Sequence, residues 1–275
     1  MDASTQPAPR GVLDPRSGER RFDLEVLRPD EELAELVEHC WLVSWDLRGR
    51  DPYGQHVLPH PSVHVVVEHD RAEVVGVTTG RFTRVLEGEG RAFGIKFRPA
   101  GFHPFVESPV SALTDRTVPI AEVFGAAGEA LAERVRGLEA PADLVEVAQA
   151  FVRARRPVAD PRVPLVNQVV AEIMEDRAIT RVDQVVERTG IGTRRLQRLF
   201  ADYVGVGPKW VVQRYRLHEA AERLAADEEL DLATLAVELG YFDQSHFIRD
   251  FTRAIGMTPV AYAEACRQNL APVSA

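Results

Sequence analysis

The sequence predicts an α+β protein, in which a small β-barrel with attached helices precedes an all-α domain of two helix-turn-helix units joined by a long helix. Two observations predict this class. Between Trp41 and Arg98 the chain has short segments rich in β-branched and aromatic residues, bounded by Gly, Pro and Asp, as strands usually are. From Ile120 onward, apolar residues recur at three- and four-residue spacing, which indicates helices.

The length and composition suit two domains of ordinary size. The 275 residues are 45% hydrophobic and 27% charged, which is typical of a globular chain. Residues 1–20 lack periodicity and are expected to form a disordered leader, and no apolar run approaches the roughly 20 residues of a membrane span. The two cysteines, Cys40 and Cys266, cannot form a disulfide framework. We therefore expect a cytoplasmic protein with no membrane partner.

The N-terminal domain is expected over residues 21–155. In its segment 91–98, bulky apolar residues alternate with residues that include Lys96 and Arg98, so one strand face is apolar and the other can line a cavity. Two helices follow after Ile120. Their apolar stripes can cover the strands of their own domain or mediate a homodimer.

A linker is expected over residues 156–163, because three prolines within ten residues cannot continue a helix. The helical remainder, residues 164–268, contains an internal repeat at an offset of 50 or 51 residues. Each copy has a short helix, a turn after Gly190 or Gly240, and a second helix that closes at Gly and restarts at Pro. Left-handed glycines end helices in this way, and the repeated pair is typical of a helix-turn-helix.

The second helix of each copy has an apolar face and a polar face. The polar faces carry arginine, glutamine, serine and histidine, whose side chains can reach phosphates and base edges. A helix-turn-helix places this face in the major groove of double-stranded DNA. The residues expected to contact DNA are Arg194, Arg195, Gln197 and Arg198 in the first copy, and Gln244, Ser245, His246 and Arg249 in the second.

Charge is unevenly distributed along this domain. The whole chain has a net charge of -9, which by itself argues against a nucleic-acid partner. However, seven basic residues and one acid lie between Arg188 and Arg216, followed by one basic residue and eight acids between Leu217 and Asp243. A charge cluster is often only a solvated helix face. In this position it predicts salt-dependent binding to DNA phosphates.

Two strings resemble the DNA-binding domain of the AraC family of transcriptional regulators. They are LQRLFADYVGVGPKWV, which starts at Leu196, and GYFDQSHFIRDF, which starts at Gly240. The resemblance departs at Gly192, where the family usually has serine as a helix cap. It implies a transcription regulator, either an activator or a repressor, that binds two successive major grooves, with RNA polymerase as a further partner.

The strings VLPHPSVHVVVE, GVTTGRFTR and FGIKFRPAGFHPF resemble an uncharacterised N-terminal domain of actinobacterial-type members of that family. This resemblance implies no effector. The strand-rich character nevertheless fits the small, cupin-like barrel sensor of many AraC-like proteins, where apolar walls and a few polar groups can hold a small-molecule effector. The residues expected to line this pocket are Trp41, Trp45, His60, His64, Lys96 and Arg98.

The alternative function is a cupin-like metal- or ligand-binding enzyme domain fused to the DNA-binding domain. His56, His60 and His64, with Glu68 further along, suggest a metal site. However, residues four apart on a strand lie about 13 Å from one another, whereas ligands of one metal lie within about 4 Å of each other. The chain also has no Gly-rich phosphate loop, nucleophile elbow or His-Glu-x-x-His motif. We therefore expect no catalysis, no metal and no cofactor.

Overall fold

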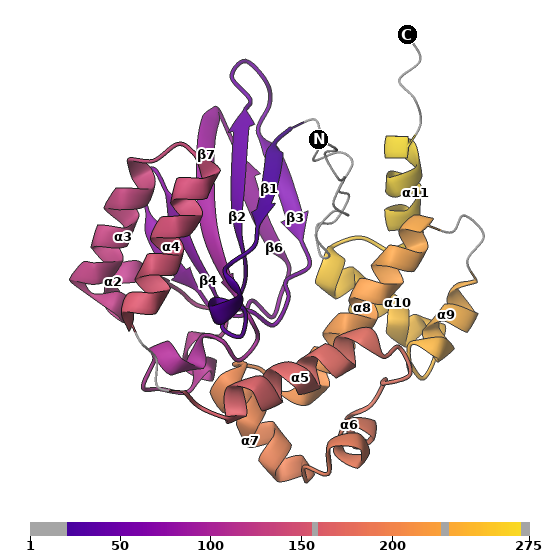
Figure 1. The fold of residues 1–275 in the computed structure, drawn as a ribbon. Helices are drawn as coiled ribbons and strands as arrows, with labels where there is room; N and C mark the ends of the chain where they lie inside the picture. Colours follow the sequence, from indigo (N-terminus) through magenta and orange to yellow (C-terminus); the bar gives the residue numbers. More distant parts are fainter. Residues whose placement is uncertain (1–20, 156–158, 227–230, 271–275) are drawn as a thin grey trace.

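The computed structural model describes residues 21–155, 159–226 and 231–270 (Figure 1). It confirms the α+β class, because its strands precede Ile120 and helices follow. The predicted leader, residues 1–20, lies outside the described residues. The strands are β1 (Asp23–Leu27), β2 (Val37–Asp46), β3 (Tyr53–Val57), β4 (His64–Glu68), β5 (Ala72–Val75), β6 (Phe82–Leu86), β7 (Glu89–Phe97) and β8 (Thr117–Pro119).

Short 3-10 helices interrupt the strand region, and α-helices make up the rest of the described chain. The 3-10 helices are η1 (Glu31–Leu33), η2 (His103–Phe105) and η3 (Val110–Leu113). The α-helices are α2 (Ile120–Phe124), α3 (Ala126–Arg136), α4 (Pro141–Arg155), α5 (Arg162–Glu175), α6 (Val182–Thr189), α7 (Thr193–Tyr203), α8 (Pro208–Ala226), α9 (Leu232–Glu238), α10 (Gln244–Ile255) and α11 (Pro259–Leu270). Within the described segments, no helix combines the length and the hydropathy that crossing a bilayer requires.

The strands form two antiparallel sheets, not the closed barrel that we predicted. The larger sheet has the order β1-β2-β7-β4-β5-β8, and β3 pairs with β6 in a separate two-stranded ribbon. A barrel requires each strand to pair on both sides. In the part of the chain that the structure describes, β1 and β8 remain sheet edges, so the ribbon covers the large sheet without closing it.

The large sheet has two apolar faces with different neighbours. Side chains such as Val65, Phe93 and Ile95 are buried on the face covered by α2, α3 and α4 (Figure 1). Buried residues of the helices, including Leu131 and Leu144, complete this core. The apolar stripes of α3 and α4 therefore cover the sheet of their own domain. The alternating residues of the same strands face the β3–β6 ribbon.

The C-terminal helices form two successive helix pairs, α6 with α7 and α9 with α10, with α8 between them (Figure 1). Gly190 and Gly240 have φ angles of 67° and 80°, the left-handed conformation predicted for the two turns. Helix α5 begins at Arg162, inside the segment predicted as a linker. It tolerates Pro164 because proline needs no amide donor in the first helical turn.

One buried apolar cluster connects the sheet to the first helix pair. It extends through α3 and α4 to α5 and α7, and includes Tyr215 of α8. A second cluster combines the end of α8 with α9, α10 and α11, and includes Leu58 from the N-terminal part. The helical half therefore shares apolar packing with the strand-rich half in both clusters along α8.

Candidate DNA-binding surface and effector cavity

Helix α7 has a buried face and a basic exposed face. Leu196, Phe200 and Tyr203 are buried in the core. All four residues predicted to contact DNA from this helix are exposed to solvent. They are Arg194, Arg195, Gln197 and Arg198. Gly192 precedes the helix without a side-chain cap, which agrees with the predicted departure at this position.

Helix α10 repeats this arrangement with fewer positive charges. Phe247 and Phe251 are buried, and Asp243 caps the helix by accepting a hydrogen bond of 2.7 Å from the His246 amide. Gln244, Ser245 and Arg249 are exposed. His246 is half-buried. Its Nε2 lies 3.5 Å from the Asp250 carboxylate, and its ring lies 5.1 Å from that of Tyr241.

The basic patch on the first unit is smaller than the sequence predicted. Arg214 and Arg216 are buried, with 3% and 2% of their surface exposed. Arg216 donates to Glu219 and to the carbonyls of Ile173 and Arg177. Arg188 pairs with Asp176. Arg188 is nevertheless exposed, and the other exposed basic residues of the patch are Arg194, Arg195, Arg198 and Lys209.

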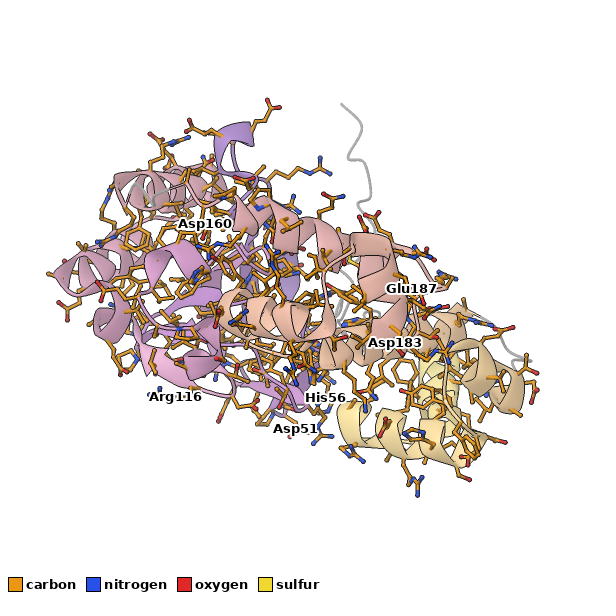
Figure 2. All side chains as sticks on the ribbon, turned by 90° about the horizontal axis from the view of Figure 1, so that it is seen from below. Asp51, His56, Arg116, Asp160, Asp183 and Glu187 are labelled. Atoms are coloured by element: carbon orange, nitrogen blue, oxygen red, sulfur yellow. The ribbon has the colours of Figure 1, made fainter. Side chains whose placement is uncertain are left out.

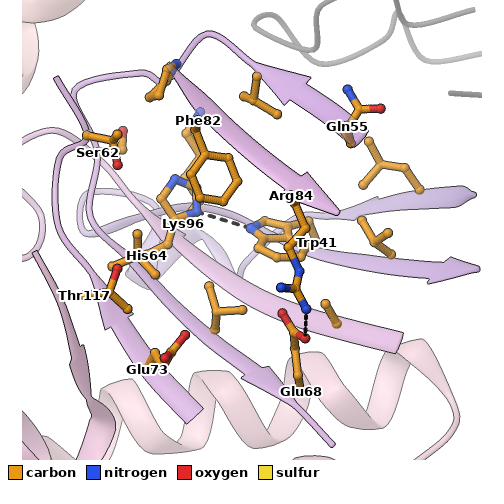
Figure 3. Close-up of a pocket in the computed structure, with 18 of the residues that line it drawn as sticks. Trp41, Gln55, Ser62, His64, Glu68, Glu73, Phe82, Arg84, Lys96 and Thr117 are labelled. Atoms are coloured by element: carbon orange, nitrogen blue, oxygen red, sulfur yellow. Dashed lines mark hydrogen bonds and ion pairs between the residues drawn. The ribbon is translucent and has the colours of Figure 1, made fainter. Parts of the chain in front are cut away.

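A cavity of about 400 Å³ lies between the large sheet and the β3–β6 ribbon (Figure 3). Five of the six predicted pocket residues line it. They are Trp41, Trp45, His60, His64 and Lys96. The prediction for Arg98 is wrong, because β7 ends at Phe97 and the Arg98 guanidinium turns away to donate to the Ala34 carbonyl. The cavity is also lined by His39, Gln55, Ser62, Phe82 and Arg84, which we did not predict.

The floor of the cavity carries two indoles, each placed over a glycine. Trp41 pairs with Gly94 and Trp45 with Gly90 across β2 and β7. A Cβ atom at Gly94 would lie 2.1 Å from Cε2 of Trp41, and one at Gly90 would lie 2.3 Å from Cζ2 of Trp45. Only glycine leaves room for the indoles at these two positions.

Polar groups occupy opposite ends of the cavity. At one end, Lys96 Nζ lies 2.8 Å from Glu38 Oε1, and Trp41 Nε1 donates to His64 Nδ1 at 3.3 Å. At the other end, Glu68 of the large sheet accepts hydrogen bonds from Arg84 of the ribbon and from Arg71 (Figure 3). The Glu68 to Arg84 ion pair therefore fastens the ribbon over the sheet.

The histidines considered for a metal site lie in different surroundings. His56, on the ribbon (Figure 2), hydrogen bonds to Thr83 at 2.9 Å. His60 stacks on His218 of α8 with ring centroids 4.3 Å apart, whereas His64 faces the cavity. Among the described residues, no three or more His, Cys, Asp or Glu side chains are grouped to hold a metal.

Comparison with known proteins assigns the helical half to a family. A family model described as a helix-turn-helix domain matches residues 185–265. The probable transcription factor PqrA of Proteus vulgaris is 29% identical over 84 residues, which are 30% of this chain and 68% of PqrA. The RCS-specific HTH-type transcriptional activator RclR of Escherichia coli is 34% identical over 112 residues, which are 41% of this chain and 38% of RclR.

The helical half is an AraC-type helix-turn-helix domain, the DNA-binding domain of transcription regulators. The shared segment spans only 25% of another relative, the HTH-type transcriptional regulator ExsA of Pseudomonas aeruginosa. A second family model, described as a domain of unknown function (DUF6597), matches residues 25–119.

Solved structures of similar proteins were also found. ToxT from Vibrio cholerae O395 aligns with a TM-score of 0.39 and 9% identity, over 90% of this chain and 98% of that one. The C-terminal domain of AraT, a response regulator from Geobacillus stearothermophilus, aligns with a TM-score of 0.34 and 23% identity, over 38% of this chain and 88% of that one.

The AraC-type domain contacts the N-terminal domain through α8 and α10. The Arg214 guanidinium, on α8, donates to the Thr79 carbonyl and lies 4.4 Å from the centroid of the Trp210 ring. Burial lowers the pKa of Arg214 to about 10. Arg81 packs on Gly256 at the end of α10, where a Cβ atom would lie 2.0 Å from Arg81 Nη1. Arg214 therefore serves the domain interface instead of a DNA phosphate.

Three further hydrogen bonds join the segment from α5 to α7 to the N-terminal domain. The Asn167 side chain, on α5, accepts from the Ala100 amide at 2.9 Å and donates to the Glu35 carbonyl at 2.9 Å. The Thr114 hydroxyl donates to the Gly205 carbonyl at 2.6 Å, in the turn after α7. These bonds connect both ends of the α5 to α7 segment with the N-terminal domain.

Proposed function

We propose that this AraC-family regulator binds operator DNA by placing α7 and α10 in two successive major grooves, and that a small molecule in the N-terminal cavity controls this binding. The observation that carries the proposal is the repeated amphipathic second helix. In both units the apolar face is buried, and the predicted DNA-contacting residues are exposed except for the half-buried His246.

The connecting helix supports a fixed spacing of the two units. Helix α8 runs unbroken from Pro208 to Ala226 and is buried along most of its length. Recognition helices on one side of B-DNA must lie about 34 Å apart, one turn of the duplex. A rigid, buried connector keeps the two units in one relative position, which favours operators with a fixed distance between half-sites.

The two recognition helices have different chemistry. The exposed face of α7 has three arginines, which suit phosphates and guanine edges. The exposed face of α10 adds Gln244, Ser245 and Arg249, while Asp250 and Asp243 lower its positive charge. We expect α7 to supply most of the electrostatic affinity and α10 to contribute mainly through base edges.

Contacts between the domains support control by the cavity. His60 lines the cavity and also stacks on His218 of α8. Thr78 lines the cavity beside Thr79, whose carbonyl accepts from Arg214. A ligand that favours one arrangement of these segments would change DNA affinity by the difference in its binding to the two states.

Further partners and the location belong to the same proposal. Phe242 and Val237, on the second unit, are 91% and 68% exposed, which supports a protein contact such as RNA polymerase.

The apolar stripes of α3 and α4 are covered, so a homodimer would use another surface. The cytoplasm is the expected location, because operator DNA and RNA polymerase are there.

Footprinting on selected DNA tests the proposal. A random duplex library is enriched with the full-length chain, and hydroxyl radicals then map the protected positions. We expect two protected windows whose centres lie about 10 base pairs apart on one side of the duplex. A single short window, or protection without any enriched sequence, would contradict binding by two recognition helices.

A further inference from the structure

Three polar side chains form one row across the cavity end of the large sheet. Lys96 of β7 is the register partner of His39 on β2 and of His64 on β4. All three line the cavity. Lys96 is 7% exposed, so its ammonium group is held inside the protein. The row therefore combines one cation with an imidazole on each side.

Both imidazoles are neutral at physiological pH. Burial, reinforced by the Lys96 charge, lowers the pKa of His39 to about 4 and that of His64 to about 3. His64 accepts the Trp41 indole proton at Nδ1, so its own proton is on Nε2. Each neutral imidazole can therefore donate one hydrogen bond without adding charge.

The Lys96 ammonium has donors left for a ligand. It can donate three hydrogen bonds, and Glu38 is its ion-pair partner among the described residues. Glu38 comes from the strand end and is not part of the cavity lining. An acceptor in the cavity would thus meet the ammonium group without displacing Glu38.

The remaining lining favours a flat apolar body. Trp41 and Trp45 form the floor over Gly94 and Gly90, and valines and leucines of β1, β2, β3 and β6 surround them. At the far end, Glu68 is already paired with Arg71 and Arg84. The cavity therefore has the polar row at one end, an ion-paired cluster at the other end, and an aromatic surface along its length.

We propose that the cavity binds a planar aromatic monocarboxylate, with its carboxylate at the His39–Lys96–His64 row and its ring on the Trp41 and Trp45 indoles. This rests on the proposed function, because it names the effector of the same site. Lys96 keeps Glu38 as its counter-ion, so a ligand carboxylate would bind through hydrogen bonds from the ammonium group and the two neutral imidazoles. A cationic ligand cannot accept these hydrogen bonds, and a phosphate dianion would bring more uncompensated charge into the cavity than a monocarboxylate.

The first test compares three ligands with one ring and different charge. Full-length protein is titrated by calorimetry at pH 7 with trans-cinnamate, cinnamamide and cinnamylamine. We expect cinnamate to bind at least tenfold more tightly than the amide and the amine to bind most weakly. Equal or tighter binding of the amide or the amine would contradict the claim that the ligand is a carboxylate. If hexanoate bound as tightly as cinnamate, the claim that the ligand is aromatic would be contradicted.

Variants locate the carboxylate within the cavity. Lys96→Met should remove the preference for cinnamate over cinnamamide, whereas Lys96→Arg should keep it. The matched control is Arg134→Met, since Arg134 is exposed on α3 and should leave the preference unchanged. Because the ligand comparison is made first on the unaltered chain, a folding defect of Lys96→Met does not decide the outcome. An unchanged preference in folded Lys96→Met would overturn the assignment of the row.

DNA binding separates this inference from the proposed function. If cinnamate does not bind but the footprint has two windows, the ligand class is wrong and the DNA-binding proposal stands. If cinnamate binds with the expected preference but leaves DNA affinity unchanged, the ligand class is supported and control by the cavity is contradicted.

Discussion

The Trp41 indole occupies the space that a side chain at Gly94 would fill. A Cβ atom at this glycine would lie 2.1 Å from Cε2 of Trp41 and 2.2 Å from its Cζ2. We predict that Gly94→Ala displaces the indole and lowers the free energy of unfolding by about 1–3 kcal/mol, the usual cost of overpacking. Urea denaturation measures this loss.

Gly80 provides the matched control. It is exposed, and a Cβ atom there would have no neighbour within 4 Å, so Gly80→Ala should change stability by less than about 0.5 kcal/mol. The double variant Trp41→Leu with Gly94→Ala should recover part of the loss relative to the two single variants. Equal stability of Gly94→Ala and Gly80→Ala would show that the indole does not need the glycine.

The stack of His60 on His218 predicts an effect on DNA binding from within the cavity. We expect His60→Ala to change the operator affinity of the ligand-free protein at least threefold, because the contact between the cavity wall and α8 is lost. Fluorescence anisotropy with the selected duplex measures it. His56→Ala is the control, since His56 contacts Thr83 on the ribbon. Equal affinities of both variants and the unaltered chain would mean that this stack does not contribute to control.

The exposed arginines of the recognition helices should contribute specific affinity. Arg198→Ala and Arg249→Ala are each expected to weaken binding to the selected operator by about 1–3 kcal/mol if they contact bases. Arg134→Ala is the control, because Arg134 is exposed on α3 in the N-terminal domain. Titrations that give all three variants the affinity of the unaltered chain would refute the assignment.

Buried and exposed basic residues should differ in the salt dependence of DNA binding. Lys209→Gln should lower the slope of log affinity against log salt by about one, as the loss of one phosphate contact does. Arg214→Gln should leave that slope unchanged and instead reduce stability, because Arg214 is buried against Trp210 and Thr79. If Arg214→Gln lowered the salt slope and Lys209→Gln left it unchanged, Arg214 and not Lys209 would be assigned to the DNA-binding surface.

This contrast shows which features were predictable from sequence. The second helix of each unit was predictable, because apolar spacing and turn glycines such as Gly190 are local signals. The burial of Arg214 was not, since it depends on a contact with Thr79 that lies 135 residues away in the chain.

The cavity was predictable only in part for the same reason. Alternation along β7 identified Lys96, and the same pattern along β2 could have identified His39, which has the same parity as Trp41. For residues of the β3–β6 ribbon, such as Phe82 and Arg84, no local sequence pattern predicts that they line the cavity. They reach the cavity because the ribbon folds over the sheet and Arg84 pairs with Glu68.

Acid should destabilise the protein through its buried histidines. The pKa values of His39 and His64 are lowered to about 4 and about 3 by burial and by Lys96, whereas an unfolded histidine titrates near 6.5. Between these values the unfolded chain binds more protons than the folded one, so stability rises with pH. Each histidine should therefore cost up to about 1.4 kcal/mol per pH unit as pH falls from about 6.5 towards its folded pKa.

Variants separate this contribution from that of carboxylates. We measure the free energy of unfolding in urea from pH 7 to pH 4.5. His64→Gln should reduce its slope against pH by up to the contribution of one proton, and His39→Gln should do the same over a slightly narrower pH range. His69→Gln is the control because His69 is exposed. Because the histidines flank the Lys96 ammonium, they can remain neutral donors for a carboxylate only while the row stays buried. A pH profile of His64→Gln that is parallel to that of the unaltered chain would show that water reaches the row, and the cavity would then lose its preference for a single negative charge.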